Sequence, residues 1–306
     1  MLTKVRIIDY VGLILLSGIW GSSFLFIKIS IETIHPTLLT FSRLLIASFF
    51  LVIYLKLIKK QKLFVKGPMN RIVIIALLGN VIPFNLISWS ETKIDSVIAA
   101  TLIGTMPFFT FLIAHILNYG EQLNKKISLG LFFGFIGMVI VVFFNKEEHS
   151  EISDINFFSS CLVISAAIFY AYSANCVKKI NHMNPLQVAT MSTIFATMIS
   201  LPIFIISINF SYSSMGYEFY NISLTSFLAC VFLGIICTGF AGVVFFSLIK
   251  KQSAGFASQS NFFIPCFGLF WSYLFLNETI NHSLILGLIL IVFGVVYVHF
   301  GRQEYS

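Results

Sequence analysis

The sequence predicts an all-α integral membrane protein with ten transmembrane helices, arranged as two inverted five-helix repeats. The chain is strongly apolar, its apolar stretches have the length of membrane spans, and its second half repeats the pattern of its first. Of 306 residues, 58% are hydrophobic and 10% are charged, whereas soluble domains carry about 25% charged residues. Too little polar surface remains to dissolve the chain, which excludes a soluble domain, a disordered chain and a disulfide-rich scaffold.

Apolar stretches of membrane-spanning length follow one another along the chain. A hydrocarbon core of about 30 Å takes about 20 helical residues to cross, and backbone polar groups cannot be left unpaired in lipid. We expect ten helices, near 10–30, 37–55, 72–90, 94–118, 127–144, 155–177, 185–207, 224–249, 254–276 and 283–300. Because several connectors are short, nine and eleven spans remain alternatives.

The basic residues give the orientation. With the N-terminus inside, the inner connectors hold 15 of the 19 Lys and Arg residues, and the outer loops hold only Lys93 and Lys146. This asymmetry is the positive-inside pattern. It predicts cytoplasmic N- and C-termini, and we expect a bacterial inner membrane. The net charge of +7 therefore reflects topology, so we expect the lipid bilayer and a small molecule as partners, and no nucleic acid. The oligomeric state stays open, with a monomer as one option.

The chain contains an internal repeat. Segment 97–143 matches segment 255–300 at an offset of 157 or 158 residues. The recurring pairs are Ala99 with Ala257, Pro107 with Pro265, Glu121 with Glu278, Gly130 with Gly287, and Gly137 with Gly294. We expect one repeat over 1–146 and a second over 147–306, with five spans each. Since five is odd, the two copies cross the membrane in opposite senses, an architecture typical of transporters that bind substrate near the midplane.

Enzyme signatures are absent from the sequence. It contains no HExxH, GxSxG or Walker-type GxxxxGK[ST] pattern, and its five cysteines have no CxxC spacing. Such motifs would place nucleophiles, metal ligands or phosphate-binding loops. We therefore expect neither an enzyme nor a bound metal or cofactor.

Three prolines lie near the middle of expected spans. Pro83, Pro107 and Pro265 each remove a helical hydrogen bond and clash with the carbonyl four residues earlier. In lipid, a freed carbonyl is tolerated only against protein or a watery cavity. One interpretation is a packing kink. The other, favoured by the repeat of two of these prolines, is a helix kink used in gating.

Polar and aromatic residues gather at membrane depth, which predicts a substrate cavity. In the ninth span, Ser258 and Asn261 share a face with Pro265, and Gln259 is close to that face. The expected substrate-binding residues are Trp20, Asn85, Trp89, Thr101, Tyr170, Ser258, Gln259 and Asn261. Helix packing is the alternative for each residue taken alone.

Charged groups inside the spans are few. Arg43 lies well inside the second span, where it either snorkels to the interface or pairs within the bundle. No acidic residue lies centrally in a span, and Glu91 and Asp95 come closest, at an outer edge. Because proton-coupled pumps usually keep a carboxylate in the membrane, we predict that transport can run down the substrate's own gradient.

The sequence resembles the drug/metabolite transporter superfamily, EamA type, over nearly its whole length. The resemblance rests on WGSSF in the first span, PTLLTFSRLL with Pro36 and Arg43, and the runs PFNLISWSE and AATLIGTMPFF, echoed by IPCFGLFWSYLFLNE. It implies a ten-helix basket with cytoplasmic termini and a cavity lined chiefly by the first, third, fourth, sixth, eighth and ninth spans. Unlike the first repeat, the second has no arginine at the equivalent position, Ser192.

These features predict a transporter that moves a small metabolite, an amino acid or related compound, with drugs as a further option. Known members of the superfamily carry such substrates. We expect alternating access through a midplane cavity between the inverted repeats, because each half can form the gate that the other forms in the opposite state. The alternative is a membrane binding or scaffold protein without transport, or an integral membrane enzyme.

Overall fold

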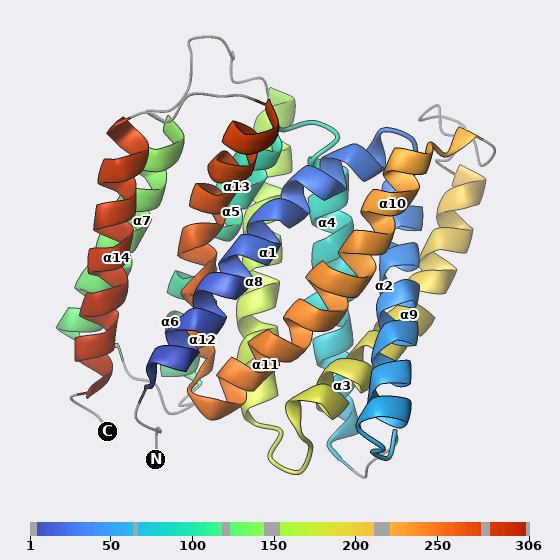
Figure 1. Cartoon of the computed structure of the whole chain (residues 1–306), viewed down its shortest axis with the longest axis horizontal. Helices are drawn as coiled ribbons and strands as arrows, with labels where there is room; N and C mark the ends of the chain where they lie inside the picture. Colours follow the sequence, from blue (N-terminus) through green and yellow to red (C-terminus); the bar gives the residue numbers. More distant parts are fainter. Residues whose placement is uncertain are drawn as a thin grey trace.

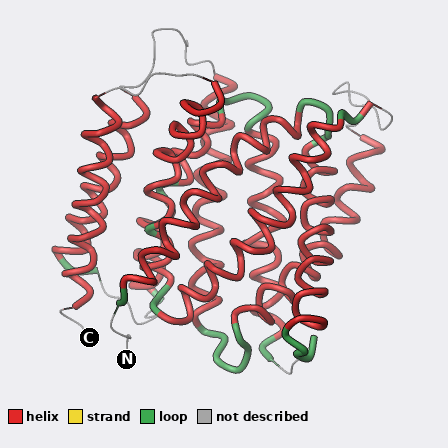
Figure 2. The backbone as a smooth tube through the Cα atoms, in the orientation of Figure 1, coloured by secondary structure: helices red, strands yellow, loops and turns green. Residues whose placement is uncertain are grey.

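The computed structural model describes residues 5–63, 67–117, 123–143, 154–210, 221–276 and 282–303. In these residues the chain forms helices and connectors and no strand (Figure 2). The paired residues Glu121 and Glu278, and the expected repeat boundary at 146, lie outside the described residues.

The helices follow the expected spans closely. The first half contains α1 (Ile7–Ile31), α2 (Pro36–Ile53) continued by η1 (Tyr54–Ile58), α3 (Met69–Ala76), η2 (Leu77–Val81), α4 (Ile82–Ser90), α5 (Ser96–Ile103), α6 (Met106–Ile116) and α7 (Lys125–Phe143). The second half contains α8 (Asp154–Lys178), α9 (Pro185–Phe210), α10 (Leu224–Phe232), η5 (Leu233–Phe240), α11 (Ala241–Lys251), α12 (Ala254–Ser258), α13 (Ser260–Leu276) and α14 (His282–Gln303).

Every expected range therefore contains helix. Among the described residues, eight helical segments are long and apolar enough to cross a membrane. An all-α, multi-pass membrane fold is confirmed by these segments, while the exact number of ten spans stays a prediction.

Side-chain caps define where several helices begin. Pro36 is the first residue of α2, where its missing N–H costs nothing, and the preceding His35 accepts a 3.3 Å hydrogen bond from the Thr37 amide through Nδ1. Ser223 caps α10 by accepting from the Ser226 amide. Burial lowers the pKa of the His35 imidazole, which keeps the ring neutral and able to act as this acceptor.

Helices at equivalent positions in the two halves make equivalent contacts. α1 packs on α13 and on α10–α11, and its counterpart α8 packs on α5–α6 and on α4. α2 packs on its counterpart α9 toward one end of the bundle, and α7 packs on its counterpart α14 at the opposite end (Figure 1). Equivalent elements thus make equivalent contacts, as two repeats related by a two-fold axis require.

The repeated glycines show the same symmetry at atomic scale. Gly130 of α7 faces Gly294 of α14, and Gly137 faces Gly287. A Cβ atom on Gly130 would lie 2.6 Å from the Gly294 carbonyl oxygen, and one on Gly294 would lie 2.5 Å from the Gly130 carbonyl. The residues that match in sequence therefore contact each other crosswise, which brings the two backbones into direct contact.

Polar contacts join helices at the end of the bundle where α1 begins and α14 ends (Figure 1). Asp9, which is 1% exposed, forms an ion pair with Lys251 and accepts a 3.0 Å hydrogen bond from Gln252. Lys178 donates to the Gln252 carbonyl at 2.7 Å, and Lys250 donates to the carbonyls of Ile180 and Met183. Lysines predicted to lie at the inner face thus satisfy backbone carbonyls around the helix ends.

Candidate functional site

Two π-helices lie at matching places in the two halves. η2 interrupts the third span and η5 interrupts the eighth. In each, a polar side chain donates to the carbonyl five residues earlier: Asn80 to Ile75 at 3.2 Å, and Thr238 to Leu233 at 2.8 Å. π-helical turns leave carbonyls imperfectly paired and often occur at functional sites. Here each π-helix contributes one polar residue, Asn80 from the first half and Thr238 from the second.

The fourth and ninth spans are both broken. α5 ends at Ile103 and α6 begins at Met106, and Gln259 separates α12 from α13. Asn261 stands beside both breaks: its amide nitrogen donates to the Ser258 carbonyl at 2.9 Å and lies 3.3 Å from the Met106 sulfur. The two discontinuities therefore meet between the repeats.

Two of the three prolines lie at these irregular places. Pro83 follows η2 directly as the second residue of α4, and Pro107 is the second residue of α6. Pro265 lies inside α13, and the carbonyl of Asn261, four residues earlier, faces Gly104 of the fourth-span break. Helix irregularity thus accompanies Pro83 and Pro107, whereas α13 continues through Pro265; a role of the three prolines in gating stays a prediction.

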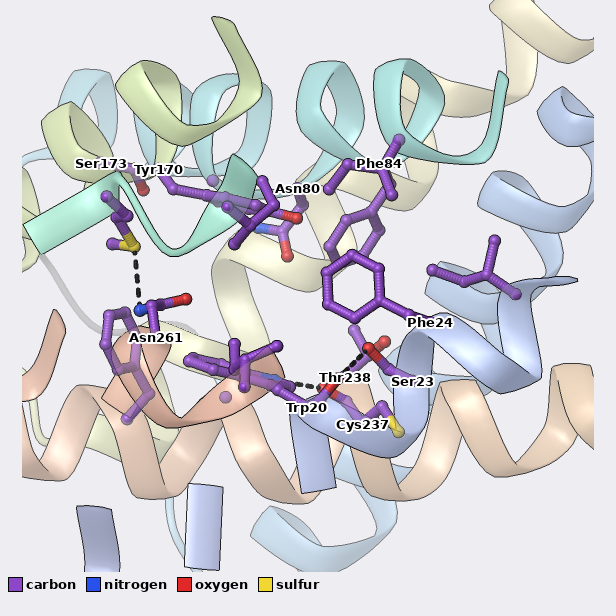
Figure 3. A pocket seen from close by; sticks show the side chains of 18 of the residues that line it. Trp20, Ser23, Phe24, Asn80, Phe84, Tyr170, Ser173, Cys237, Thr238 and Asn261 are labelled. Atoms are coloured by element: carbon purple, nitrogen blue, oxygen red, sulfur yellow. Dashed lines mark hydrogen bonds between the residues drawn. The ribbon is translucent and has the colours of Figure 1, made fainter. Parts of the chain in front are cut away.

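A cavity of about 110 Å³ lies where these features converge (Figure 3). Side chains from α1, α2, the α3–η2–α4 segment, α5, α6, α8, the η5–α11 segment and α13 form its wall. These are the spans that the family resemblance implies, with α2 in addition. Pockets for drug-sized molecules start at about 300 Å³, so the cavity in this conformation suits a compact solute.

Aromatic side chains make up much of the wall. Trp20 donates from Nε1 to the Cys237 carbonyl at 3.1 Å and packs edge-on against Phe245 with 5.0 Å between ring centroids. Across the cavity, Phe84 and Tyr170 form a second edge-on pair (Figure 3). The Trp20 N–H is thus satisfied by protein, and its ring offers an apolar surface to the cavity.

Arg43 supplies the charge in the wall. Its side chain is 4% exposed, and Nε and Nη2 donate to the Thr238 hydroxyl oxygen at 3.1 and 3.0 Å. Its guanidinium carbon lies 3.8 Å from the Phe84 ring centroid, in cation–π contact. Of the two possibilities left open by the sequence, the structure shows Arg43 inside the bundle and not at the interface.

Three of the eight expected substrate-binding residues line the cavity: Trp20, Tyr170 and Asn261. They come from α1, α8 and α13, so the fold brings together residues from both halves. Figure 3 shows Trp20 and Asn261 on one side and Tyr170 on the other.

The other five expected residues, Asn85, Trp89, Thr101, Ser258 and Gln259, lie outside the cavity lining. On α4, the cavity side is formed by Phe84 and Ile87, while Trp89 packs against Phe158 of α8. Asn85 and Thr101 donate to carbonyls four residues earlier in their own helices. Polar side chains that pair with their own helix need no cavity. Substrate contact by these five residues stays a prediction.

Sequence reasoning missed Asn80 and Thr238 as wall residues. Both stand alone in apolar runs, so no polar stripe marks them. The one signal in the sequence is a glycine beside each, Gly79 and Gly239, in matching spans of the two repeats. A π-helix cannot be recognised from such a pattern, because the extra residue in the turn is set by packing.

A buried carboxylate lies at the edge of a span that the sequence predicts to face outward. Glu91, directly after α4, is fully buried, and its Oε2 accepts a 3.1 Å hydrogen bond from Ser96. Burial raises the pKa of this carboxyl well above its usual range, against the opposing effects of the Ser96 hydrogen bond and the charges of Lys28 and Arg43. Glu91 is not part of the cavity wall.

The fold and the cavity together define the class of this protein. Apolar spanning helices in two matching halves, with helix breaks and π-turns around a buried cavity, are the features of a membrane transporter. No group of three or more His, Cys, Asp and Glu side chains in the described residues could hold a metal ion.

Comparison with known proteins identifies the family. The EamA-like transporter family matches residues 8–143 and again residues 157–300. The chain belongs to this family.

Two relatives align with this chain over almost its full length. An uncharacterized transporter, YoaV, of Bacillus subtilis (strain 168) is 27% identical over 292 residues, covering 93% of this chain and 94% of the relative. Protein PagO of Salmonella typhimurium is 27% identical, covering 92% and 89%. A solved crystal structure superposes with a TM-score of 0.76 at 16% identity, covering 99% of this chain and 100% of that one, and shows the same fold.

Proposed function

We propose that this membrane transporter carries a small metabolite, an amino acid or related compound, by alternating access through the cavity between its two repeats. The observation that carries the proposal is the position of the cavity. Its wall contains the π-turns of the third and eighth spans and borders the breaks of the fourth and ninth. Helix segments that lack regular hydrogen bonds can rearrange at low cost, and here they border the cavity in which the solute would bind.

The mixed character of the wall supports a metabolite over a purely apolar ligand. Aromatic rings from α1, α4 and α11 provide apolar surface, and Asn80, Ser173 and Asn261 provide polar groups. Few, well-placed polar groups in an apolar pocket are typical of small-molecule sites. We further propose that residues 1–146 and 147–306 act as the two moving repeats, in a bacterial inner membrane with both termini cytoplasmic.

A cavity-filling substitution tests this proposal. Gly242 lines the cavity, and a Cβ atom at this position would meet nothing within 4 Å. Gly242→Leu should therefore fill the cavity without straining the fold, and we expect it to abolish substrate flux in proteoliposomes reconstituted with the purified protein. The substrate is first selected from a panel of amino acids and related metabolites.

Gly268→Leu is the matched control. Gly268 is also half-buried in a helix, and a Cβ atom there would likewise meet nothing within 4 Å, but it does not line the cavity. We expect this variant to keep wild-type flux. Wild-type flux in Gly242→Leu, or equal loss in both variants, would show that the cavity is not the pathway.

A further inference from the structure

The charge in the cavity wall forms no ion pair with a described residue, although the Glu91 carboxyl, which lies outside the wall, is close enough to interact with it electrostatically. Arg43 is the charged side chain among the described residues that line the cavity; no Asp, Glu, Lys or His of the described residues lines it. Its hydrogen-bonding partner Thr238 is neutral and donates its own proton to the Leu233 carbonyl. No carboxylate of the described residues lies within ion-pair distance of the guanidinium. Buried arginines in membrane proteins are normally paired or functional.

The second half of the chain has no charged residue at the position that matches Arg43. The position equivalent to Arg43 in the second half is Ser192, whose hydroxyl donates to the Ala189 carbonyl in its own helix. The wall is otherwise built from matching elements of the two halves, such as η2 and η5. A packing role demanded by the fold itself would be expected in both halves, whereas the cation occurs in one.

Unused hydrogen-bonding groups accompany the arginine. Tyr170 and Ser173 line the cavity, and their hydroxyls make no hydrogen bond with a described residue. Arg43 itself uses Nε and Nη2, and Nη1 has no partner among the described residues. A guanidinium and hydroxyl donors in the wall of one cavity match a carboxylate, which accepts several hydrogen bonds at once.

We propose that the cavity selects compact solutes that carry a carboxylate on an apolar body, with Arg43 holding the carboxylate. This inference rests on the proposed function: with the cavity as the transport pathway, the transported metabolites are anionic or carry a carboxylate. The aromatic wall receives the apolar body. Exclusion of amines follows from the same charge, because a cationic group would meet Arg43 without a carboxylate to offset it.

Binding of a matched probe series tests this charge selection. The probes are 3-methylbutanoate, 3-methylbutanamide and 3-methylbutylamine, which share one apolar body and differ in charge. Apparent Kd values come from the rise in the unfolding midpoint of the full-length protein with probe concentration, in detergent or nanodiscs. For the wild type we expect the carboxylate to bind about tenfold or more tightly than the amide and the amine.

Variants of the arginine separate binding from packing. Arg43→Gln should bring the carboxylate and the amide to within about threefold of each other. Arg43→Lys should keep the preference for the carboxylate at lower affinity, because lysine keeps the charge but not the forked geometry. Arg71→Gln is the control: Arg71 donates to the Lys179 carbonyl away from the cavity, so the same loss of charge should leave the preference unchanged.

The inference is overturned if the amide or the amine binds the wild type as tightly as the carboxylate, or if none of the probes binds at millimolar concentration. It is also overturned if a folded Arg43→Gln, or Arg43→Lys where the glutamine variant does not fold, leaves the wild-type affinities unchanged. A preference lost in Arg43→Gln, combined with unchanged flux in Gly242→Leu, supports the anion site and rejects the transport pathway. The two proposals therefore fail separately.

Discussion

At the scale of single residues, a hydrogen bond to the helix's own backbone does not tell a structural asparagine from a cavity asparagine. Asn80 and Asn85 belong to the same helical segment, and both donate to earlier carbonyls, at 3.2 and 2.8 Å. Only Asn80 lines the cavity. The difference is one of helix face, and the face that lines the cavity is set by the helices that pack around it.

This pair allows a direct test of the site. Asn80→Ala should weaken substrate binding by about 1–3 kcal/mol, about 5- to 150-fold in affinity, because a positioned polar contact is lost. Asn85→Ala should leave it near the wild-type value. The measurement is the KM for uptake of the selected substrate into proteoliposomes. The reverse result would favour the stripe of Asn85 and Trp89 predicted from the sequence.

At the scale of helices, α7 and α14 form the contact that depends most on small residues. Gly130 and Gly294 touch each other's backbone, as do Gly137 and Gly287. Neither α7 nor α14 contributes to the cavity wall. The pair contacts the cavity-forming helices through α5 and α13.

Alanine substitution tests the closeness of this contact. Gly130→Ala should destabilise the protein by about 1–3 kcal/mol, because the added methyl group meets backbone atoms that cannot move aside. Gly268→Ala, with nothing within 4 Å, should be neutral or stabilising, since alanine favours helix by about 1 kcal/mol over glycine. Unfolding midpoints in detergent give both effects. Equal midpoints for the two variants would contradict the close backbone packing.

At the scale of the whole molecule, the start of α1 and the end of α14 lie on one side of the bundle (Figure 1). This agrees with an even number of crossings. The basic residues near this side, among them Arg6, Lys178 and Lys250, predict that it faces the cytoplasm. Lys178 and Lys250 also donate hydrogen bonds to backbone carbonyls at the helix ends. The residues that predict the orientation therefore also stabilise the local structure.

Reporter fusions test the topology. A reporter joined after Ser306 should give a cytoplasmic signal, and one inserted within residues 147–153 should give an external signal, because five spans separate the N-terminus from that connector. Activity of a periplasm-specific and a cytoplasm-specific reporter at each position provides the measurement. Signals from the same side would show that the first half does not cross an odd number of times.

The sequence predicted the helical ranges more fully than the residues that line the cavity. All ten expected ranges contain helix, since the length of an apolar run is dictated by membrane thickness. Trp20, Tyr170 and Asn261 were found because each is large or polar at membrane depth. Asn80 and Thr238 were not, because a single polar residue in an apolar run has no pattern around it.

The sequence by itself determined that this protein is an apolar, multi-pass helical chain built from two similar halves, and that it belongs among transporters. Composition, span length and repeat offset are local or additive properties, so they can be read without coordinates. Only the tertiary structure decided which helix faces meet, that η2 and η5 replace regular helix, and that Arg43 turns inward to Thr238 and the cavity. These depend on contacts between residues far apart in the chain, such as Arg43 and Thr238, which no pattern within one span contains.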